Sequence, residues 1–288
     1  PVRSHSHAVG SPPGSALPEW QWNTPPRAWV PLDLGALWRY RELLYFLAWR
    51  DIKVRYQQTV LGIAWAIIQP VFMAVIFSIF LGRLAGIPSD GLPYPLFVYS
   101  GLVVWQLFAL ALAESTSSVV TNASLITKVY FPRLVIPLAS VGVGLVDSLI
   151  ASSVLVGLLA YYRVPLGPAL LAAPLFLLLA ALTALAVGIW LAALNVQYRD
   201  VRYTTTFLIQ LWLFATPVVY PSSLVPEMWR PLLGLNPMAG VVEGFRWAVL
   251  GQGVLPLGVI ATSTATTAVV LLGGLFYFRR MEQSFADT

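Results

Sequence analysis

Six long apolar stretches, separated by clusters of charged residues, dominate the chain from about residue 61 to residue 278. A helix needs roughly 20 apolar residues to cross a hydrocarbon core about 30 Å thick. We therefore expect an all-α membrane protein with six transmembrane helices. The spans are placed at about 61–82, 95–118, 134–160, 168–194, 204–220 and 256–278.

Composition agrees with a chain that crosses the membrane several times. Hydrophobic residues make up 58% of the chain and charged residues only 10%, and the mean hydropathy is +0.76. Soluble domains carry about 25% charged residues, so that class is excluded.

The basic residues divide unequally between the two sides that six spans create. Eleven lie on one side, four lie on the other, and Arg3 and Arg27 lie in the N-terminal segment. Basic residues are enriched on the cytoplasmic side, which predicts that both termini are cytoplasmic. The eleven are Arg39, Arg41, Arg50, Lys53, Arg55, Lys128, Arg133, Arg199, Arg202, Arg279 and Arg280, and the four are Arg83, Arg163, Arg230 and Arg246.

Residues 1–35 differ from the rest because they are rich in Pro, Ser and Gly and lack an apolar run. We expect a cytosolic N-terminal extension rather than a signal peptide. Trp20, Trp22 and Trp29 are unusual in a solvated segment. Two interpretations stay open: the extension lies on the protein's own cytosolic surface, or it is a docking strand for a soluble partner.

Two segments outside the spans have a pattern of their own. Residues 36–55 mix apolar residues at helical spacing with basic ones, which is typical of an interfacial helix lying along the membrane surface. The transmembrane domain then covers 56–280, with a cytosolic tail at 281–288. Residues 221–255 are apolar and punctuated by proline, which predicts an external re-entrant helical hairpin between spans five and six.

The chain carries no recognisable catalytic centre. Cysteine is absent, and the only histidines, His5 and His7, lie in the N-terminal extension, which argues against a metal site. A phosphate-binding glycine loop followed by Lys and Ser or Thr is also missing. We therefore expect a non-catalytic transport protein without a cofactor of its own.

Two carboxylates fall within the predicted spans: Asp147 at the centre of the third and Glu114 near the cytoplasmic end of the second. An ionisable group inside a membrane is costly and is a functional candidate by default. The alternatives are a packed hydrogen bond to a neighbouring helix and participation in a proton-coupled carrier.

Two spans carry a helical face on which aromatic residues accompany a glutamine. Residues three or four apart share one face of a helix, and an amide is poorly suited to face lipid. The face is either an ordinary helix contact or the lining of a path for a sugar chain, because rings stack on sugars and amides bond hydroxyls. The residues are Trp65, Gln69, Phe72 and Ile76 on the first span and Phe207, Gln210 and Phe214 on the fifth.

Four stretches follow one another in a distinctive order. They are WRDIKVRYQQTVLGIAWAIIQP (49–70), TKVYFPRLVIPL (127–138), LNVQYRDVRY (194–203), and TPVVYP (216–221) with LNPMAGVVEGFRW (235–247). Together with the tail FRRMEQSFADT, they resemble permease subunits of ABC exporters of polysaccharides and polyol phosphates. The first stretch carries the resemblance through Arg50, Asp51, Arg55, Tyr56, Leu61, Gly62, Trp65 and Pro70.

This resemblance implies a half-transporter, similar to O-antigen exporters, that moves a glycan linked to undecaprenyl diphosphate across the inner membrane. Two copies of the chain would pair with two copies of a cytosolic ABC ATPase, which binds ATP and magnesium. A capsule or teichoic-acid exporter is the alternative within the family. A proton-coupled secondary carrier that uses Asp147 and Glu114 is the alternative from another class.

The resemblance also implies contacts with the ATPase. Residues 122–131 would form the first coupling helix and residues 197–202 the second. The ATPase-coupling residues are then Asn122, Ile126, Lys128, Tyr130, Phe131, Gln197, Arg199, Asp200 and Arg202.

The helix at 36–53 would act as a gate at the cytosolic entry. Arg50, Lys53 and Arg55 lie where a lipid diphosphate would arrive, and Arg and Lys bind phosphate. Ordinary anchoring of a cytoplasmic flank is the alternative for these three residues.

Overall fold

The computed structural model describes residues 34–57, 62–226, 228–251 and 255–282. The chain divides into two compact units, Pro1–Pro31 and Leu32–Thr288, and every described residue belongs to the second. The predictions for residues 1–33 and for the end of the tail therefore lie outside the described residues. The described part contains helices and no strand, which confirms the all-α prediction.

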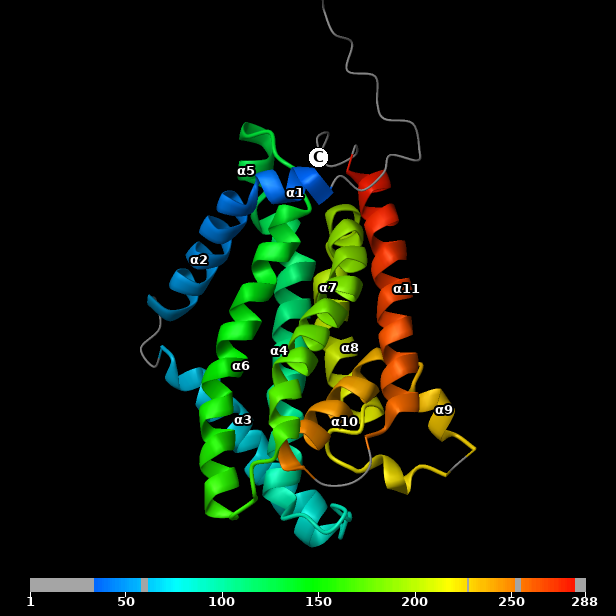
Figure 1. Ribbon diagram of the computed structural model, residues 1–288. Helices are drawn as coiled ribbons and strands as arrows, with labels where there is room; N and C mark the ends of the chain where they lie inside the picture. The colour runs from blue at the N-terminus through cyan, green and yellow to red at the C-terminus, as the bar shows by residue number, and fades with distance from the viewer. Residues whose placement is uncertain (1–33, 58–61, 227, 252–254, 283–288) are drawn as a thin grey trace, which may run out of the picture. The chain divides into compact units, whose positions relative to one another are not determined.

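The helices follow one another without any intervening sheet (Figure 1). They are α1 (Leu34–Arg39), α2 (Arg41–Gln57), α3 (Ala64–Phe77), the π-helical η1 (Ser78–Leu84), α4 (Tyr94–Thr121), α5 (Ala123–Lys128), α6 (Val135–Tyr161), the 3₁₀ turn η2 (Pro168–Ala172), α7 (Ala173–Gln197), α8 (Val201–Ala215), the 3₁₀ turn η3 (Ser222–Leu224), α9 (Arg230–Leu233), α10 (Pro237–Leu250) and α11 (Leu257–Met281).

Five helical segments in the described part of the chain are long and apolar enough to cross a membrane. Each begins and ends within a few residues of a predicted span. They are Ala64–Leu84, Tyr94–Thr121, Val135–Tyr161, Pro168–Gln197 and Leu257–Met281.

The fifth predicted span, 204–220, is not one long helix, so the six-span count is not confirmed. α8 has 15 residues and ends at Ala215, and Thr216 is extended, with φ −104° and ψ 141°. Pro217 explains this end, because proline has no N–H to donate and disfavours helical backbone in the residue before it.

α4 lies at the centre of the bundle and is buried along most of its length (Figure 1). It contacts α3, α6, α7, α8 and α10. A small residue permits the closest approach to α7, because a Cβ at Gly188 would lie 2.5 Å from Oγ of Ser115. Close contacts at small residues are a usual basis of helix packing in membranes.

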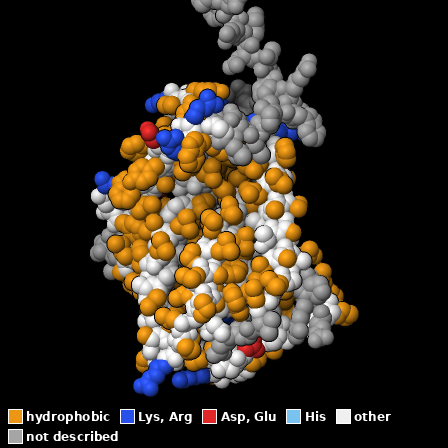
Figure 2. All heavy atoms as spheres, viewed as in Figure 1, with side chains coloured by type: hydrophobic (Ala, Val, Ile, Leu, Met, Phe, Trp, Pro, Cys, Tyr) orange, Lys and Arg blue, Asp and Glu red, His pale blue; other side chains and the backbone are white. Residues whose placement is uncertain are grey.

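Hydrophobic side chains cover the middle of the face that Figure 2 shows, and Lys and Arg gather at its two ends. This distribution is typical of an apolar belt with charges at the membrane boundaries. We call the end that holds α1, α5 and the C-terminal end of α11 the α5 end. The opposite end, which holds η1 and the C-terminal end of α6, is the η1 end (Figure 1).

The predicted interfacial helix is two helices, α1 and α2, which meet at Tyr40. α2 slants along α6 instead of crossing it at a right angle (Figure 1). A small apolar core between α2 and the start of α6 stabilises this arrangement. Its buried members are Leu47, Phe131, Val135, Ile136 and Ala139.

The predicted re-entrant connection contains η3, α9 and α10. α10 is almost entirely buried against α4, α7 and α11. The side chain of Asn236 caps this helix by accepting a hydrogen bond from the backbone N–H of Met238 at 3.0 Å. The protein thus shields α10, but a re-entrant hairpin is not confirmed.

Candidate functional site between helices α2, α5 and α6

Arg50 joins α2 to the junction between α4 and α5. Its guanidinium donates to Oδ1 of Asp51 at 2.7 and 2.9 Å and to Oδ1 of Asn122 at 2.8 Å. Asn122 is buried, and its amide also donates to the carbonyl oxygen of Ser118 at 2.8 Å. The structure therefore places a predicted gate residue directly against a predicted coupling residue.

Asp147, near the midpoint of α6, receives the other end of α2. Arg55 donates to its Oδ2 at 2.8 Å, and the hydroxyl of Tyr56 donates to its Oδ1. The side chain of Asp147 is 13% exposed and that of Arg55 is 33% exposed. The packed-contact interpretation of Asp147 thus finds partners, but they are a cation and a phenol from α2 rather than Ser, Thr or backbone groups.

The Tyr56 hydroxyl is protonated when it donates its hydrogen bond to Asp147. Burial, helped by its hydrogen bond to Asp147, raises the pKa of the Tyr56 hydroxyl. The phenol therefore keeps its proton at neutral pH and donates a hydrogen bond to the carboxylate. Asp147 is bound through both oxygens, which fixes the C-terminal end of α2 against α6.

Glu114 adds a second carboxylate from α4 to this region. Its side chain is half-buried, and it interacts electrostatically with Asp51, Arg55, Asp147 and Arg202. The two acids that the sequence places on separate spans thus belong to one group of charges. The charges of this group come from α2, α4, α6 and the start of α8.

Most of the predicted ATPase-coupling side chains lie on the surface of the α5 end. Tyr130 is 92% exposed, and Tyr198, beside the predicted set, is 56% exposed. This surface carries both charged side chains and aromatic rings. The exposed members of the predicted set are Lys128, Tyr130, Gln197, Arg199, Asp200 and Arg202.

Three members of the predicted coupling set point into the protein instead. Phe131 is buried in the small core between α2 and α6, Asn122 is buried beside Arg50, and Ile126 is half-buried. These side chains anchor the loop that presents the exposed residues.

The two aromatic faces lie on the surface of this chain. At the end of α3, the ring of Phe77 meets the ring of Phe214 on α8 edge-on, with ring centroids 6.4 Å apart. α3 and α8 therefore lie side by side at this contact. Neighbouring helices of this chain therefore leave most of both faces uncovered. The exposed residues are Trp65, Gln69, Phe72, Phe207, Gln210 and Phe214, with Ile76 beside them.

Arg246 is a residue whose role the sequence did not indicate. It counts as an external charge in the distribution of basic residues, yet its side chain is buried on α10. The guanidinium donates to the carbonyl oxygens of Pro217 at 3.2 Å and Val218 at 3.0 Å. It also lies 3.7 Å from the ring centroid of Phe97, which is a cation–π contact.

One signal in the sequence could have identified Arg246. A helical pattern read through residues 237–250 places this arginine among apolar and small residues rather than at a span end. A charge in such a position needs buried acceptors. The segment that follows α8 provides them. Pro217 ends the helix, so the carbonyl oxygens of Pro217 and Val218 have no donor within a helix.

Comparison with known proteins supplies the context for this geometry. Residues 42–250 match the family model for the ABC-2 type transporter. The O-antigen export system permease protein RfbA of Klebsiella pneumoniae is 30% identical over 256 residues, which cover 88% of this chain and 96% of the relative.

Two further relatives extend the comparison. The protein of the same name from Myxococcus xanthus is 31% identical over 259 residues, which cover 88% of this chain and 97% of the relative. The polysialic acid transport protein KpsM of Escherichia coli is 24% identical over 244 residues, covering 82% of this chain and 92% of the relative. These relatives match the chain over nearly their whole length.

Proposed function

This chain belongs to the ABC-2 type transporter family, and on that premise we propose that it exports a lipid-linked polysaccharide of the O-antigen type. It is a membrane permease of an ABC transporter, and such permeases are non-catalytic subunits. The proposal adds the substrate, a glycan carried on undecaprenyl diphosphate, and the direction, across the inner membrane.

One observation carries the choice of substrate. Identity of about 30% with permeases named for O-antigen export extends over 88% of this chain and nearly all of each relative. Identity with the polysialic acid transport protein is lower, at 24%. A capsule-type polymer is therefore the second candidate.

The complex that we propose contains two copies of this chain and two copies of an ABC ATPase that binds ATP and magnesium. The exposed side chains of the α5 end face the ATPase. α8 and the turn from Thr216 to Tyr220 make the sixth crossing, and α9 with α10 form the re-entrant hairpin. This topology keeps both termini on the cytoplasmic side.

Helix α2 transmits movement from the ATPase in this proposal. Arg50 ties it to Asn122 at the start of α5, and Arg55 ties it to Asp147 on α6. Movement of α5 therefore carries α2 with it and changes the contact on α6.

Of the three cations assigned to the lipid diphosphate, Lys53 is exposed and makes no hydrogen bond or ion pair with any described residue.

The aromatic faces of α3 and α8 would line the conduit when two copies meet. They are exposed on this chain, and their rings and amides match the apolar faces and hydroxyls of sugars. A path lined in this way would bind a glycan without specificity for the order of its sugars.

The proton-coupled carrier does not fit the family to which the chain belongs. The geometry also argues against it, because both oxygens of Asp147 are engaged by Arg55 and Tyr56.

The proposal is tested by purifying the chain with its ATPase in lipid nanodiscs and measuring ATP hydrolysis with added lipid-linked glycan. We expect stable association and hydrolysis that responds to glycan. Charge reversal of Lys128 and Arg199 together should weaken association, whereas reversal of Arg163, at the η1 end, should not. Transport by this chain alone, driven by a proton gradient, would contradict the proposal.

A further inference from the structure

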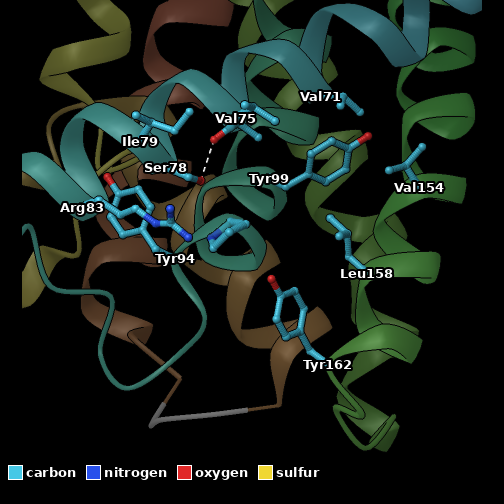
Figure 3. Close-up of a pocket in the computed structure, with 13 residues that line it drawn as sticks. Val71, Val75, Ser78, Ile79, Arg83, Tyr94, Tyr99, Val154, Leu158 and Tyr162 are labelled. Carbon is cyan, nitrogen blue, oxygen red and sulfur yellow. Dashed lines mark hydrogen bonds between the residues drawn. The ribbon is translucent and has the colours of Figure 1, made fainter.

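A partly open cavity of about 630 Å³ lies between α3, η1, α4 and α6 near the η1 end (Figure 3). It is separate from the charged residues around Asp147. It also uses a different face of α3 from the aromatic face, because Val71 lines the cavity while its neighbour Phe72 is turned about 100° away. A cavity of this size is within the range of about 300–1,000 Å³ typical of ligand sites.

The lining changes from apolar to polar along the length of the helices. Val71, Val75, Val154 and Leu158 line the part that lies within the predicted membrane spans. Figure 3 shows these side chains on α3 and α6 facing one another across the cavity. This part of the site suits a hydrocarbon chain.

The polar end of the cavity coincides with the ends of three membrane spans. Arg83 is the last residue but one of Ala64–Leu84, Tyr94 is the first residue of Tyr94–Thr121, and Tyr162 directly follows Val135–Tyr161. Tyrosine and arginine at this level are typical of the boundary between hydrocarbon and headgroups. The cavity therefore has the polarity of the bilayer around it.

Arg83 is the charge that the cavity offers to a ligand. It is exposed and is the only charged residue among the described residues of the lining. It makes no hydrogen bond or ion pair with any of the described residues. The hydroxyls of Tyr94 and Tyr99 already donate to the carbonyl oxygens of Val219 and Ala151, at 2.7 and 3.0 Å. An anion thus has one strong donor, at the rim.

The rim is built by close packing. The seven residues of η1 are π-helical, a rare form that is frequent at functional sites. A Cβ at Gly82 would lie 2.8 Å from Cδ1 of Tyr94, so only glycine lets this ring pack against η1. This contact holds the ring of Tyr94 beside Arg83 at the rim of the cavity.

We propose that this cavity binds one anionic glycerophospholipid of the surrounding bilayer. An acyl chain lies between α3 and α6, and the phosphate is bound by Arg83, whose guanidinium forms strong paired hydrogen bonds with phosphate. The inference goes beyond the proposed transport function and does not depend on it, because binding is measured without the ATPase or a glycan.

The test is quantitative native mass spectrometry of the purified chain, in detergent, with phosphatidylglycerol and with zwitterionic phosphatidylcholine. Arg83→Gln should lower retention of phosphatidylglycerol about five-fold, the contribution of one arginine to binding an anionic lipid. Retention of phosphatidylcholine should fall less, because its choline already offsets the charge of the phosphate. Arg163→Gln, which removes an exposed arginine of the same end outside the cavity lining, is the control and should have no effect.

A second variant tests the apolar part. Val75→Trp fills the space between α3 and α6 and should reduce retention of both lipids, whereas Leu149→Trp, on an exposed position of α6 outside the cavity, should reduce neither. Unchanged phosphatidylglycerol in both Arg83→Gln and Val75→Trp would overturn the proposal. So would loss of a dimer without loss of lipid in Val75→Trp, which would identify a second copy as the occupant, or full displacement by equimolar undecaprenyl phosphate, which would identify the carrier lipid.

Discussion

Two arginines in different parts of the bundle hold the chain together in different ways. Arg55, one-third exposed, joins two helices through an ion pair with Asp147 at 2.8 Å. Arg246 is buried and donates to the backbone carbonyls of Pro217 and Val218 while lying over Phe97. One binds a charged side chain on another helix, and the other stabilises the irregular end of α8.

The difference indicates which part of the molecule moves. An ion pair with partial access to water can break at modest cost, because both charges regain solvent. A buried arginine whose acceptors are backbone carbonyls cannot, since every broken bond leaves a buried polar group without a partner. We infer that α2 is the movable element and that α10 is part of the rigid frame.

The largest effect is expected at the rigid end. Arg246→Met keeps the length of the side chain but leaves the Pro217 and Val218 carbonyls without their donor, which should destabilise the fold by about 3 kcal/mol. Thermal unfolding in detergent measures this directly. Arg163→Met, at an exposed position near the same end, should change the unfolding temperature little. Equal effects of the two substitutions would remove the basis of the comparison.

These two arginines also show what a sequence can and cannot predict here. Apolar run lengths place five spans to within a few residues because burial in lipid depends on composition alone. The partner of Asp147 lies 92 residues away on α2, so no local pattern indicates it. Burial of Arg246 could not be predicted by counting charges, because a charge count ignores which side chains tertiary contacts bury. The shortness of α8 follows from one residue, Pro217, whose effect on the predicted span was underestimated.

The second prediction concerns the pair that joins α2 to α6. Arg55→Gln and Asp147→Asn should each lower transport-coupled ATP hydrolysis, and the double variant should lose little more than either alone. The expected coupling free energy is about 1–2 kcal/mol, below the value for a fully buried pair because Arg55 is one-third exposed. A double-mutant cycle on unfolding stability and on hydrolysis measures it.

The hydrolysis measurement shows whether the ion pair of Arg55 and Asp147 takes part in transport or only stabilises the fold. If Arg55 and Asp147 serve only stability, the cycle gives the same coupling in unfolding experiments and no coupling in the response of hydrolysis to glycan. Additive effects of the two substitutions in both experiments would show that the pair is not the connection between α2 and α6.

A smaller effect is expected where α2 meets α5. Asn122→Ala removes the acceptor for Arg50 and the donor to the Ser118 carbonyl, which should cost about 1 kcal/mol of stability. Glycan-stimulated hydrolysis should fall more than basal hydrolysis, because the ATPase still binds but α2 follows α5 less closely. Thr121→Ala, at an exposed neighbouring position, is the matched control. A parallel fall in basal and stimulated hydrolysis would place Asn122 in the ATPase contact instead.

The smallest effect is expected at Lys53. Of the three cations assigned to the lipid diphosphate, it is the one that makes no hydrogen bond or ion pair with any described residue. Arg50 and Arg55 connect α2 to its neighbours, so only Lys53 is free to attract a lipid diphosphate. Lys53→Gln should leave the unfolding temperature unchanged and raise the lipid-linked glycan concentration for half-maximal hydrolysis about five-fold, as loss of one cation near an anionic headgroup predicts. The maximal rate should stay the same, because the links at both ends of α2 remain. A lower maximal rate with unchanged half-saturation would mean that Lys53 belongs to the moving connection and not to the lipid contact, and the cations of α2 would then act as one group.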